Sequence, residues 1–236
     1  MATAFITGAS RGIGKATATL FAKNGWDLIL TARNEESLKL LADELSKENV
    51  KVSYIAMDLS DSNQISIQLP TFLKENNSPS VLINNAGVAW TGELMSMPIR
   101  TWEWLIQVNL TSIFQICTNV IPLMRSNGGG LVINVSSHAA RNAFSGWSAY
   151  CVSKAALENF TKCLAEEERA NSIRACTLTI GSVNSSLWDT DTVQGSFDRD
   201  AMLDRSEVAK ALLHLANQPP TQIIEDMTLM PATGAF

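Results

Sequence analysis

The chain has 236 residues, enough for one large α/β domain with a covered core; 46% of them are hydrophobic and 17% are charged, an ordinary balance for a globular protein. Its formal net charge of -5 argues against nucleic acid as a partner, because phosphate binding usually leaves a basic face. No apolar run approaches the length of a membrane span, so we expect neither nucleic acid nor membrane among its partners.

The start of the chain and its cysteines both bear on the compartment. The first residues run directly into a predicted strand and lack the basic segment, apolar segment and cleavage site of a secretory signal. We therefore expect a cytoplasmic location. The cysteines form no C-x-x-C pair and no zinc-type spacing, so we expect reduced thiols and no metal site.

Short β-rich runs alternate with helical patterns along most of the sequence. Several runs are apolar at consecutive positions, which is typical of parallel strands buried on both faces. This alternation predicts right-handed βαβ crossovers, and hence an α/β fold with a doubly wound parallel sheet of Rossmann type, in one domain over residues 1–236. The expected strands are residues 3–7, 27–32, 51–57, 81–84, 131–135, 174–179 and about 227–230, with helices such as 14–24, 37–48 and 102–124 between them.

A glycine-rich turn at residues 7–14 follows the first predicted strand and opens the first predicted helix. A helix N-terminus offers unpaired N–H groups and a partial positive charge, and glycines let the backbone approach a pyrophosphate. The alternative is a tight turn without a ligand. Because the turn lies inside the first βαβ unit, we predict a dinucleotide phosphate site made by Gly8, Ser10, Arg11, Gly12, Ile13 and Gly14.

The end of the second strand bears on the choice between NAD and NADP. Folds that bind NAD usually place an acid there for the ribose 2′-hydroxyl, and a basic residue suits the 2′-phosphate of NADP. Here the strand ends at Arg33 with no acid, and Arg11 lies in the facing turn. Guanidinium groups bind phosphate bidentately, although both arginines could instead be solvated surface charges. We favour phosphate binding and predict NADP(H) as the cofactor.

Tyr150 and Lys154 stand four residues apart on a predicted helix, so both side chains can meet one ligand. A free tyrosine has a pKa of about 10 and is a poor base at neutral pH. A nearby ammonium group would favour the phenolate, and so would an oxidised nicotinamide ring. A serine at the end of a strand can steady a substrate oxygen, and Ser136 and Ser137 compete for that role. The alternative is a chance surface pair.

These motifs, in this order, resemble the short-chain dehydrogenase/reductase family over residues 7 to about 185. The resemblance implies hydride transfer between NADP(H) and a small carbonyl or alcohol substrate, with Tyr150 as general acid/base. It implies that Ser137, by its separation from the tyrosine, steadies the substrate oxygen and that Lys154 bonds the nicotinamide ribose. It also implies that Asn109 bends its helix and holds a proton-relaying water.

The resemblance assigns further cofactor contacts. It places Asp58 at the adenine amino group, although Asp58 or Ser60 could instead cap the following helix. The chain departs from the family after its sixth predicted strand, with Ile180 in place of a proline and Ser185 in place of a threonine. We expect cofactor binding to survive this change. The implied contacts are Asp58, Leu59, Asn85, Ala86, Gly87, Tyr150, Lys154, Gly181, Val183 and Ser185.

The substrate region is expected to be apolar and partly covered by a lid. Residues 182–203 lack periodicity, and an irregular stretch of this length is often a binding loop. Trp147 and Trp188 are candidates for substrate contacts, and so is His138, which points either into the pocket or into solvent. Family members commonly pair through two long helices, so the resemblance implies a homodimer or homotetramer. The alternative to an enzyme is a non-catalytic NADP(H)-binding sensor or scaffold on the same fold.

Overall fold

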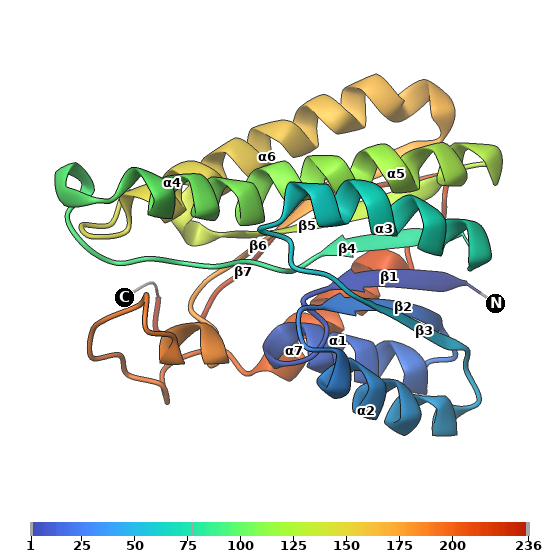
Figure 1. The fold of residues 1–236 in the computed structure, drawn as a ribbon, viewed down its shortest axis with the longest axis horizontal. Helices are drawn as coiled ribbons and strands as arrows, with labels where there is room; N and C mark the ends of the chain where they lie inside the picture. The colour runs from blue at the N-terminus through green and yellow to red at the C-terminus, as the bar shows by residue number, and fades with distance from the viewer. Residues whose placement is uncertain (1, 77, 235–236) are drawn as a thin grey trace.

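A seven-stranded parallel sheet forms the centre of the computed structural model, which describes residues 2–76 and 78–234 (Figure 1). The strand order is β3-β2-β1-β4-β5-β6-β7. The predicted doubly wound sheet is confirmed, and each predicted strand lies within two residues of an observed one. The strands are β1 (Thr3–Thr7), β2 (Asp27–Ala32), β3 (Val52–Ala56), β4 (Val81–Asn84), β5 (Gly130–Ser137), β6 (Ile173–Ile180) and β7 (Asp226–Leu229).

Helices cover both faces of the sheet (Figure 1). The layer with Phe21 and Leu212 packs on strand residues such as Ile6, and the layer with Leu69 packs on Phe5. All five residues of β1 are buried, because neighbouring residues of a strand face opposite layers. The first layer holds α1 (Gly12–Lys23), α2 (Glu35–Leu45) and α7 (Arg205–Ala216); the second holds α3 (Ser62–Glu75), α4 (Ile99–Ile106), α5 (Ser112–Ser126) and α6 (Ser148–Glu168).

Two predicted helices differ from the observed ones in their geometry. The helix expected at residues 37–48 ends as α2 at Leu45 and continues as the 3-10 turn Ser46–Glu48. The helix expected at 102–124 is divided into α4 and α5 by the π-helical segment Gln107–Thr111. Such segments widen a helix locally and are frequent at functional sites. Asn109 lies in this one, at the position where the resemblance implied a bend.

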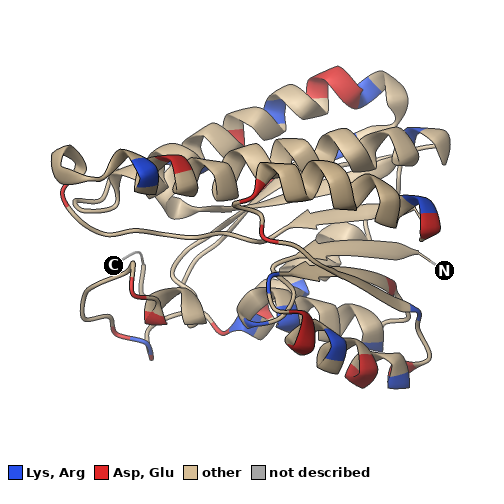
Figure 2. Cartoon of the chain, viewed as in Figure 1, with Lys and Arg blue, Asp and Glu red and all other residues tan. Residues whose placement is uncertain are grey.

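The continuous helical stretch Ile99–Ser126 has the length and hydropathy of a membrane span. The expectation that no apolar run reaches that length is therefore wrong. Half of its apolar window is buried inside the fold, where Ile116 and Val120 pack on the sheet. Figure 2 shows few charged residues on this helix. A helix that is apolar over most of its surface is either a core helix or a membrane span, and packing on the sheet accounts for this one.

The irregular segment predicted at residues 182–203 has a defined shape. It contains the 3-10 turn Ser186–Asp189, and a parallel bridge between Val183 and Leu203 closes its base. Arg199, near the end of the segment, bonds to residues near its start: it donates to Asn184 Oδ1 at 2.7 Å and pairs with Asp189 at 2.8 Å. We call residues 182–203 the lid from here on.

An ionic network centred on the buried Glu158 joins α6 to β5, β6 and β7. The carboxylate of Glu158 on α6 accepts hydrogen bonds from Ser136 at 3.2 Å, Thr179 at 3.0 Å and Arg141 at 3.1 Å. Arg141 also pairs with Asp226 of β7. Both carboxylate oxygens have partners, so the cost of burying the charge is offset.

We expect Glu158→Gln to lower the free energy of unfolding by about 2 kcal/mol, because it removes the buried charge at the centre of the network and leaves Arg141 paired with Asp226 alone. Urea denaturation at neutral pH measures this loss. The control is Glu207→Gln, which breaks an exposed pair with Lys210 on α7 and should cost at most about 0.5 kcal/mol. Equal losses in the two variants would show that the buried network contributes no more than a surface ion pair.

Candidate functional site

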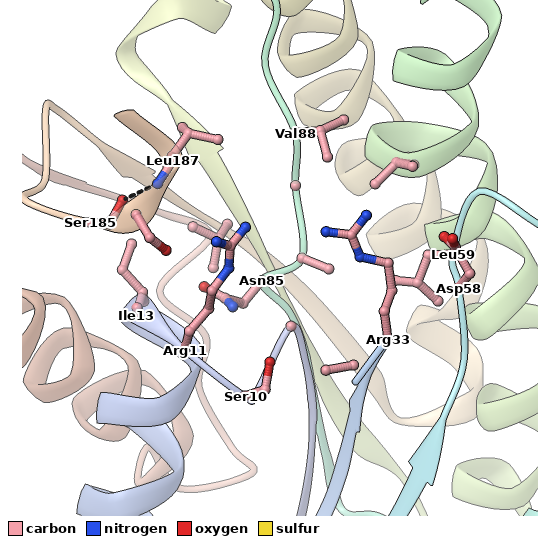
Figure 3. A pocket seen from close by; sticks show the side chains of 18 of the residues that line it. Ser10, Arg11, Ile13, Arg33, Asp58, Leu59, Asn85, Val88, Ser185 and Leu187 are labelled. Carbon is pink, nitrogen blue, oxygen red and sulfur yellow. Dashed lines mark hydrogen bonds between the residues drawn. The ribbon is translucent and has the colours of Figure 1, made fainter. Parts of the chain in front are cut away.

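A cavity of about 440 Å³ opens along the carboxyl edge of the sheet, where β1 lies between β2 and β4 (Figure 3). Strands β2 and β3 continue the sheet on one side of β1, and β4 to β7 continue it on the other. Ligands of doubly wound sheets bind at the point where the strand order changes direction in this way. Gly181 and Val183 line a neighbouring cavity instead. The wall of the larger cavity contains the other predicted cofactor-binding residues that face it: Gly8, Ser10, Arg11, Gly12, Ile13, Arg33, Asp58, Leu59, Asn85, Ala86, Gly87, Tyr150, Lys154 and Ser185.

The glycines of the first turn fix its shape. Gly8 and Gly12 have φ angles of +67° and +57°, which other residues rarely adopt. A Cβ on Gly14 would lie 2.1 Å from the carbonyl oxygen of Gly8, so this glycine lets α1 pack against the turn and does not itself face the cavity. Thr7 Oγ1 accepts hydrogen bonds from the backbone N–H groups of Asn85 and Ala86 at 3.0 Å, which holds the turns after β1 and β4 together.

The cavity has basic groups on two sides. Arg11 of the first turn and Arg33 after β2 extend their guanidinium groups into it (Figure 3). Neither arginine has an ion-pair partner within residues 2–76 and 78–234. Two guanidinium groups without ion-pair partners, beside a turn whose glycines have positive φ angles, suit a ligand with several phosphates.

Asp58 lies at the far end of the same cavity, beside Leu59 (Figure 3). Its Oδ1 atom accepts hydrogen bonds from the backbone N–H and the hydroxyl of Ser60 at 2.9 and 2.8 Å. The cap of α3 is Asp61, which accepts from the backbone N–H groups of residues 63 and 64. The alternative that Asp58 or Ser60 caps this helix is therefore wrong.

The structure separates the two candidate serines at the end of β5. Ser136 is buried and donates to Glu158, so its hydroxyl is occupied. Ser137 is the last residue of the strand, points to the opposite face and lines the second cavity. Its Oγ accepts from the backbone N–H of Ala139 at 3.2 Å and also bonds with Tyr150. Ser137 is therefore the serine that lies beside Tyr150 in the second cavity.

Tyr150 and Lys154 lie on one face of α6 with the Lys154 Nζ atom 5.8 Å from the centre of the tyrosine ring. Lys154 Nζ donates to the carbonyl of Val135 at 2.9 Å, and burial lowers the pKa of this lysine to about 8. Burial raises the pKa of Tyr150 to about 12, while a hydrogen bond with Ser137 acts in the opposite direction. Desolvation is the larger of these two causes, and the phenol of Tyr150 therefore keeps its proton at neutral pH.

The amide of Asn109 connects the loop after β4 to α6. Its Oδ1 accepts from the backbone N–H of Val88 at 2.8 Å, and its Nδ2 donates to the Val88 carbonyl at 2.8 Å and to Ser153 Oγ at 3.0 Å. Ser153 in turn donates to the backbone carbonyl of Tyr150 at 2.8 Å. Both ends of the Asn109 amide thus bond to the protein and join this loop to α6.

A second cavity of about 180 Å³ adjoins the first, and Tyr150 lines both. The three residues predicted to contact substrate, His138, Trp147 and Trp188, all line it. His138 thus faces the pocket, with its ring 6.1 Å from that of Phe144. Tyr150 thus lies between a large cavity lined by two arginines and a small cavity lined mainly by apolar and aromatic side chains.

Sequence reasoning missed two aromatic residues of these walls. Trp104 of α4 lines the larger cavity, and its spacing of four from Val108, another lining residue, could have indicated this shared face. Phe197 of the lid lines the smaller cavity. No periodicity surrounds Phe197 in the sequence, so only the folded lid shows where it lies.

Comparison with known proteins gives consistent results. A family profile described as short chain dehydrogenase matches residues 2–194. The chain is 32% identical over 228 residues to the 3-oxoacyl-(acyl-carrier-protein) reductase of Chlamydia trachomatis serovar D, covering 94% of this chain and 92% of that protein. It is 31% identical over 239 residues to the NADP-dependent 3-hydroxy acid dehydrogenase of Schizosaccharomyces pombe, covering 98% and 92%.

Solved structures share the fold over nearly the whole chain. A metagenomic short-chain oxidoreductase in complex with NADP superposes with a TM-score of 0.85 at 31% identity, covering 98% of this chain and 97% of that one. An alcohol dehydrogenase from the archaeon Thermococcus sibiricus, complexed with 5-hydroxy-NADP, has a TM-score of 0.89 at 25% identity, with coverage of 98% and 97%.

The lowered pKa of Lys154 predicts a pH-dependent stability. Between its folded pKa of about 8 and its ordinary value of 10.5, the unfolded chain binds a proton that the folded chain releases, so stability rises with pH through this window. The free energy of unfolding of the native chain should rise by about 2 kcal/mol relative to that of Lys154→Met between about pH 7.5 and about pH 10.

Urea denaturation at the two pH values measures this difference, and subtraction of the variant cancels the other titrating groups. Lys210→Met removes an exposed lysine and is the matched control, for which we expect no such difference. If the free energies of unfolding of the native chain and Lys154→Met change with pH in parallel, burial does not lower the pKa of Lys154.

Proposed function

The chain belongs to the short-chain dehydrogenase/reductase family, and from that premise we propose that it is an NADP(H)-dependent oxidoreductase that reduces a carbonyl compound to an alcohol. The observation that carries the proposal is the position of Tyr150, which lines both cavities with Ser137 and Lys154 beside it. A hydride donor in the larger cavity and a carbonyl group in the smaller one would meet at this side chain.

The larger cavity suits NADP(H) in shape and charge. The first turn offers backbone N–H groups at the start of α1 for the pyrophosphate, and Arg11 and Arg33 are free to bind the 2′-phosphate. Asp58 keeps its Oδ2 atom for the adenine amino group, since its bonds to Ser60 use Oδ1. The NADP complexes of related structures support the same assignment. When bound, NADPH supplies the hydride that adds to the carbonyl carbon and is left as NADP⁺.

The protein supplies the proton. Tyr150, protonated at neutral pH, donates its proton to the carbonyl oxygen, and Ser137 donates a hydrogen bond to the same oxygen. Hydride at carbon and proton at oxygen together give the alcohol. Lys154 holds the ribose of the cofactor and, while charged, eases loss of the proton from the tyrosine. Asn109 positions these groups through Ser153.

The turn after β6 keeps its function despite the unusual Ile180. Ile180 lines both cavities, and a Cβ on Gly181 would lie 2.6 Å from Pro231 Cδ, so the glycine is also needed for packing of the C-terminal segment. We assign Val183 and Ser185 to the nicotinamide end of the cofactor, and Leu59, Asn85, Ala86 and Gly87 to the adenosine part. The start of the lid lies over the phosphate turn, where a Cβ on Gly12 would be 3.8 Å from Ser185 Cβ.

Pairing of the chain into a homodimer or homotetramer is part of the proposal. Phe114 of α5 and Val152 of α6 are 53% and 47% exposed, which suits contact between the two long helices of neighbouring copies. The single domain and the cytoplasmic location stay predictions.

The acid/base assignment predicts that Tyr150→Phe lowers the rate of carbonyl reduction by about a thousandfold, because the proton donor is lost. NADPH oxidation with a panel of ketones and aldehydes measures the rate, and fluorescence titration shows unchanged NADPH binding. Tyr54→Phe, at the only other tyrosine of the chain, is the matched control and should keep full activity. A Tyr150→Phe variant as active as the native chain would disprove the assignment. Tight NADPH binding without turnover of any carbonyl in the panel would favour a sensor or scaffold.

The phosphate assignment predicts that replacing Arg11 and Arg33 by glutamine raises the Kd for NADPH by about 10- to 100-fold per arginine, because each removes a charge-assisted bond to the 2′-phosphate. The Kd for NADH should change by less than about threefold. The control is Arg169→Gln, which removes an arginine paired with Glu166 at the surface. Equal increases in the Kd values for NADPH and NADH would show that the arginines do not bind the 2′-phosphate.

A further inference from the structure

Among residues 2–76 and 78–234, no formally charged side chain lines the smaller cavity, whereas Arg11, Arg33, Asp58 and Lys154 line the larger one. Its polar side chains are the hydroxyl groups of three serines and Tyr150, together with the imidazole of His138. A carboxylate buried here would lose its hydration without meeting a cation, which is costly. The wall therefore selects against anions.

Three aromatic side chains, which we call the aromatic wall, form one side of this cavity: Trp147, Trp188 and Phe197. Trp147 and Trp188 meet edge to face with ring centres 5.5 Å apart, and Trp188 lies 4.5 Å from Phe197. Trp147 also lies 5.7 Å from the ring of Tyr150, again edge to face. A flat apolar group placed against this wall would continue the same packing and bring its carbonyl to Tyr150.

Two polar side chains at the aromatic wall, Trp188 and His138, have partners within the protein. The indole N–H of Trp188 donates to the carbonyl of Val183 at 2.8 Å, so this tryptophan presents only its rings. The Asn142 amide nitrogen lies 2.9 Å from His138 Nε2 and donates to the His138 carbonyl at 3.2 Å.

The arginine of the lid, Arg199, also has its guanidinium group bound to other residues. Arg199 donates to Asn184 Oδ1 and to the Ser185 carbonyl and pairs with Asp189, and it is not part of the cavity wall. Arg141, three residues after His138, is held by Glu158 and Asp226. Neither arginine is free to receive a carboxylate in the cavity.

We propose that the smaller cavity, with its aromatic wall and its lack of charged side chains, selects uncharged carbonyl compounds that carry an aromatic or similarly flat apolar arm and rejects carboxylates. This inference rests on the proposed reductase function and names the substrate class of that site. A cavity of about 180 Å³ is smaller than a typical drug-sized pocket, so the arm is about one ring in size. The chain would thus differ from its yeast relative, whose name specifies a 3-hydroxy acid.

The test compares three benzaldehydes that differ only at the para position: methyl, carboxamide and carboxylate. The amide matches the carboxylate in size but carries no charge, so it separates charge from shape. With NADPH saturating, kcat/KM for the methyl and amide compounds should agree within about tenfold, and para-formylbenzoate should be at least about 100-fold poorer than the amide. Loss of NADPH fluorescence measures all three.

Two variants of Phe197 in the lid test the wall itself. Phe197→Lys places an ammonium group beside the cavity. It should raise kcat/KM for para-formylbenzoate, relative to kcat/KM for the carboxamide, at least about tenfold. Phe197→Leu should lower the preference for para-methylbenzaldehyde over hexanal by about three- to tenfold, because an edge-to-face contact is lost. Phe72→Leu on α3, a half-buried phenylalanine that lines neither cavity, is the matched control and should change neither ratio.

The outcomes separate this inference from the proposed function. If para-formylbenzoate is reduced as well as the amide, the substrate class is wrong while the reductase function stands. If no carbonyl is reduced although NADPH binds, the proposed function fails and the inference fails with it.

Discussion

The parallel direction of the seven strands is the constraint on which the rest of this structure depends. Because every strand runs the same way, every turn that follows a strand lies at one edge of the sheet. Residues as distant in sequence as Gly8, Asp58, Asn85 and Ser137 are brought together there without any local tendency to associate. The point where β1 separates β2 from β4 opens the larger cavity at this edge.

Burial gives the site its proton chemistry. Lys154 and Tyr150 lie on one face of α6, where desolvation disfavours the charged form of both groups. Burial therefore keeps the tyrosine protonated and lowers the pKa of the lysine to about 8. The same helix carries Glu158, whose network with Arg141 and β7 keeps α6 in register with the strands.

Asn109 shows how a locally unfavourable residue can serve the whole fold. An asparagine inside a helix competes with backbone hydrogen bonding, and the helix here opens into a π-segment. The amide instead binds the backbone of Val88 and the hydroxyl of Ser153, so the loop after β4, α5 and α6 are joined at one residue. The departure from regular helix is thereby compensated by tertiary contacts.

The sequence alone determined the strand–helix alternation, the sheet class and the motifs of the candidate site, because each depends on periodicity or on short spacings such as Tyr150 to Lys154. It did not determine that burial dominates the pKa of Tyr150, which serine at the end of β5 lies beside Tyr150, or that Phe197 reaches the smaller cavity. Those features depend on desolvation and on contacts between residues far apart in the chain, such as Ser136 with Glu158 and Trp188 with Phe197. Only packing of the helices and the lid against the sheet fixes them, since no local pattern encodes which distant side chain fills a given space.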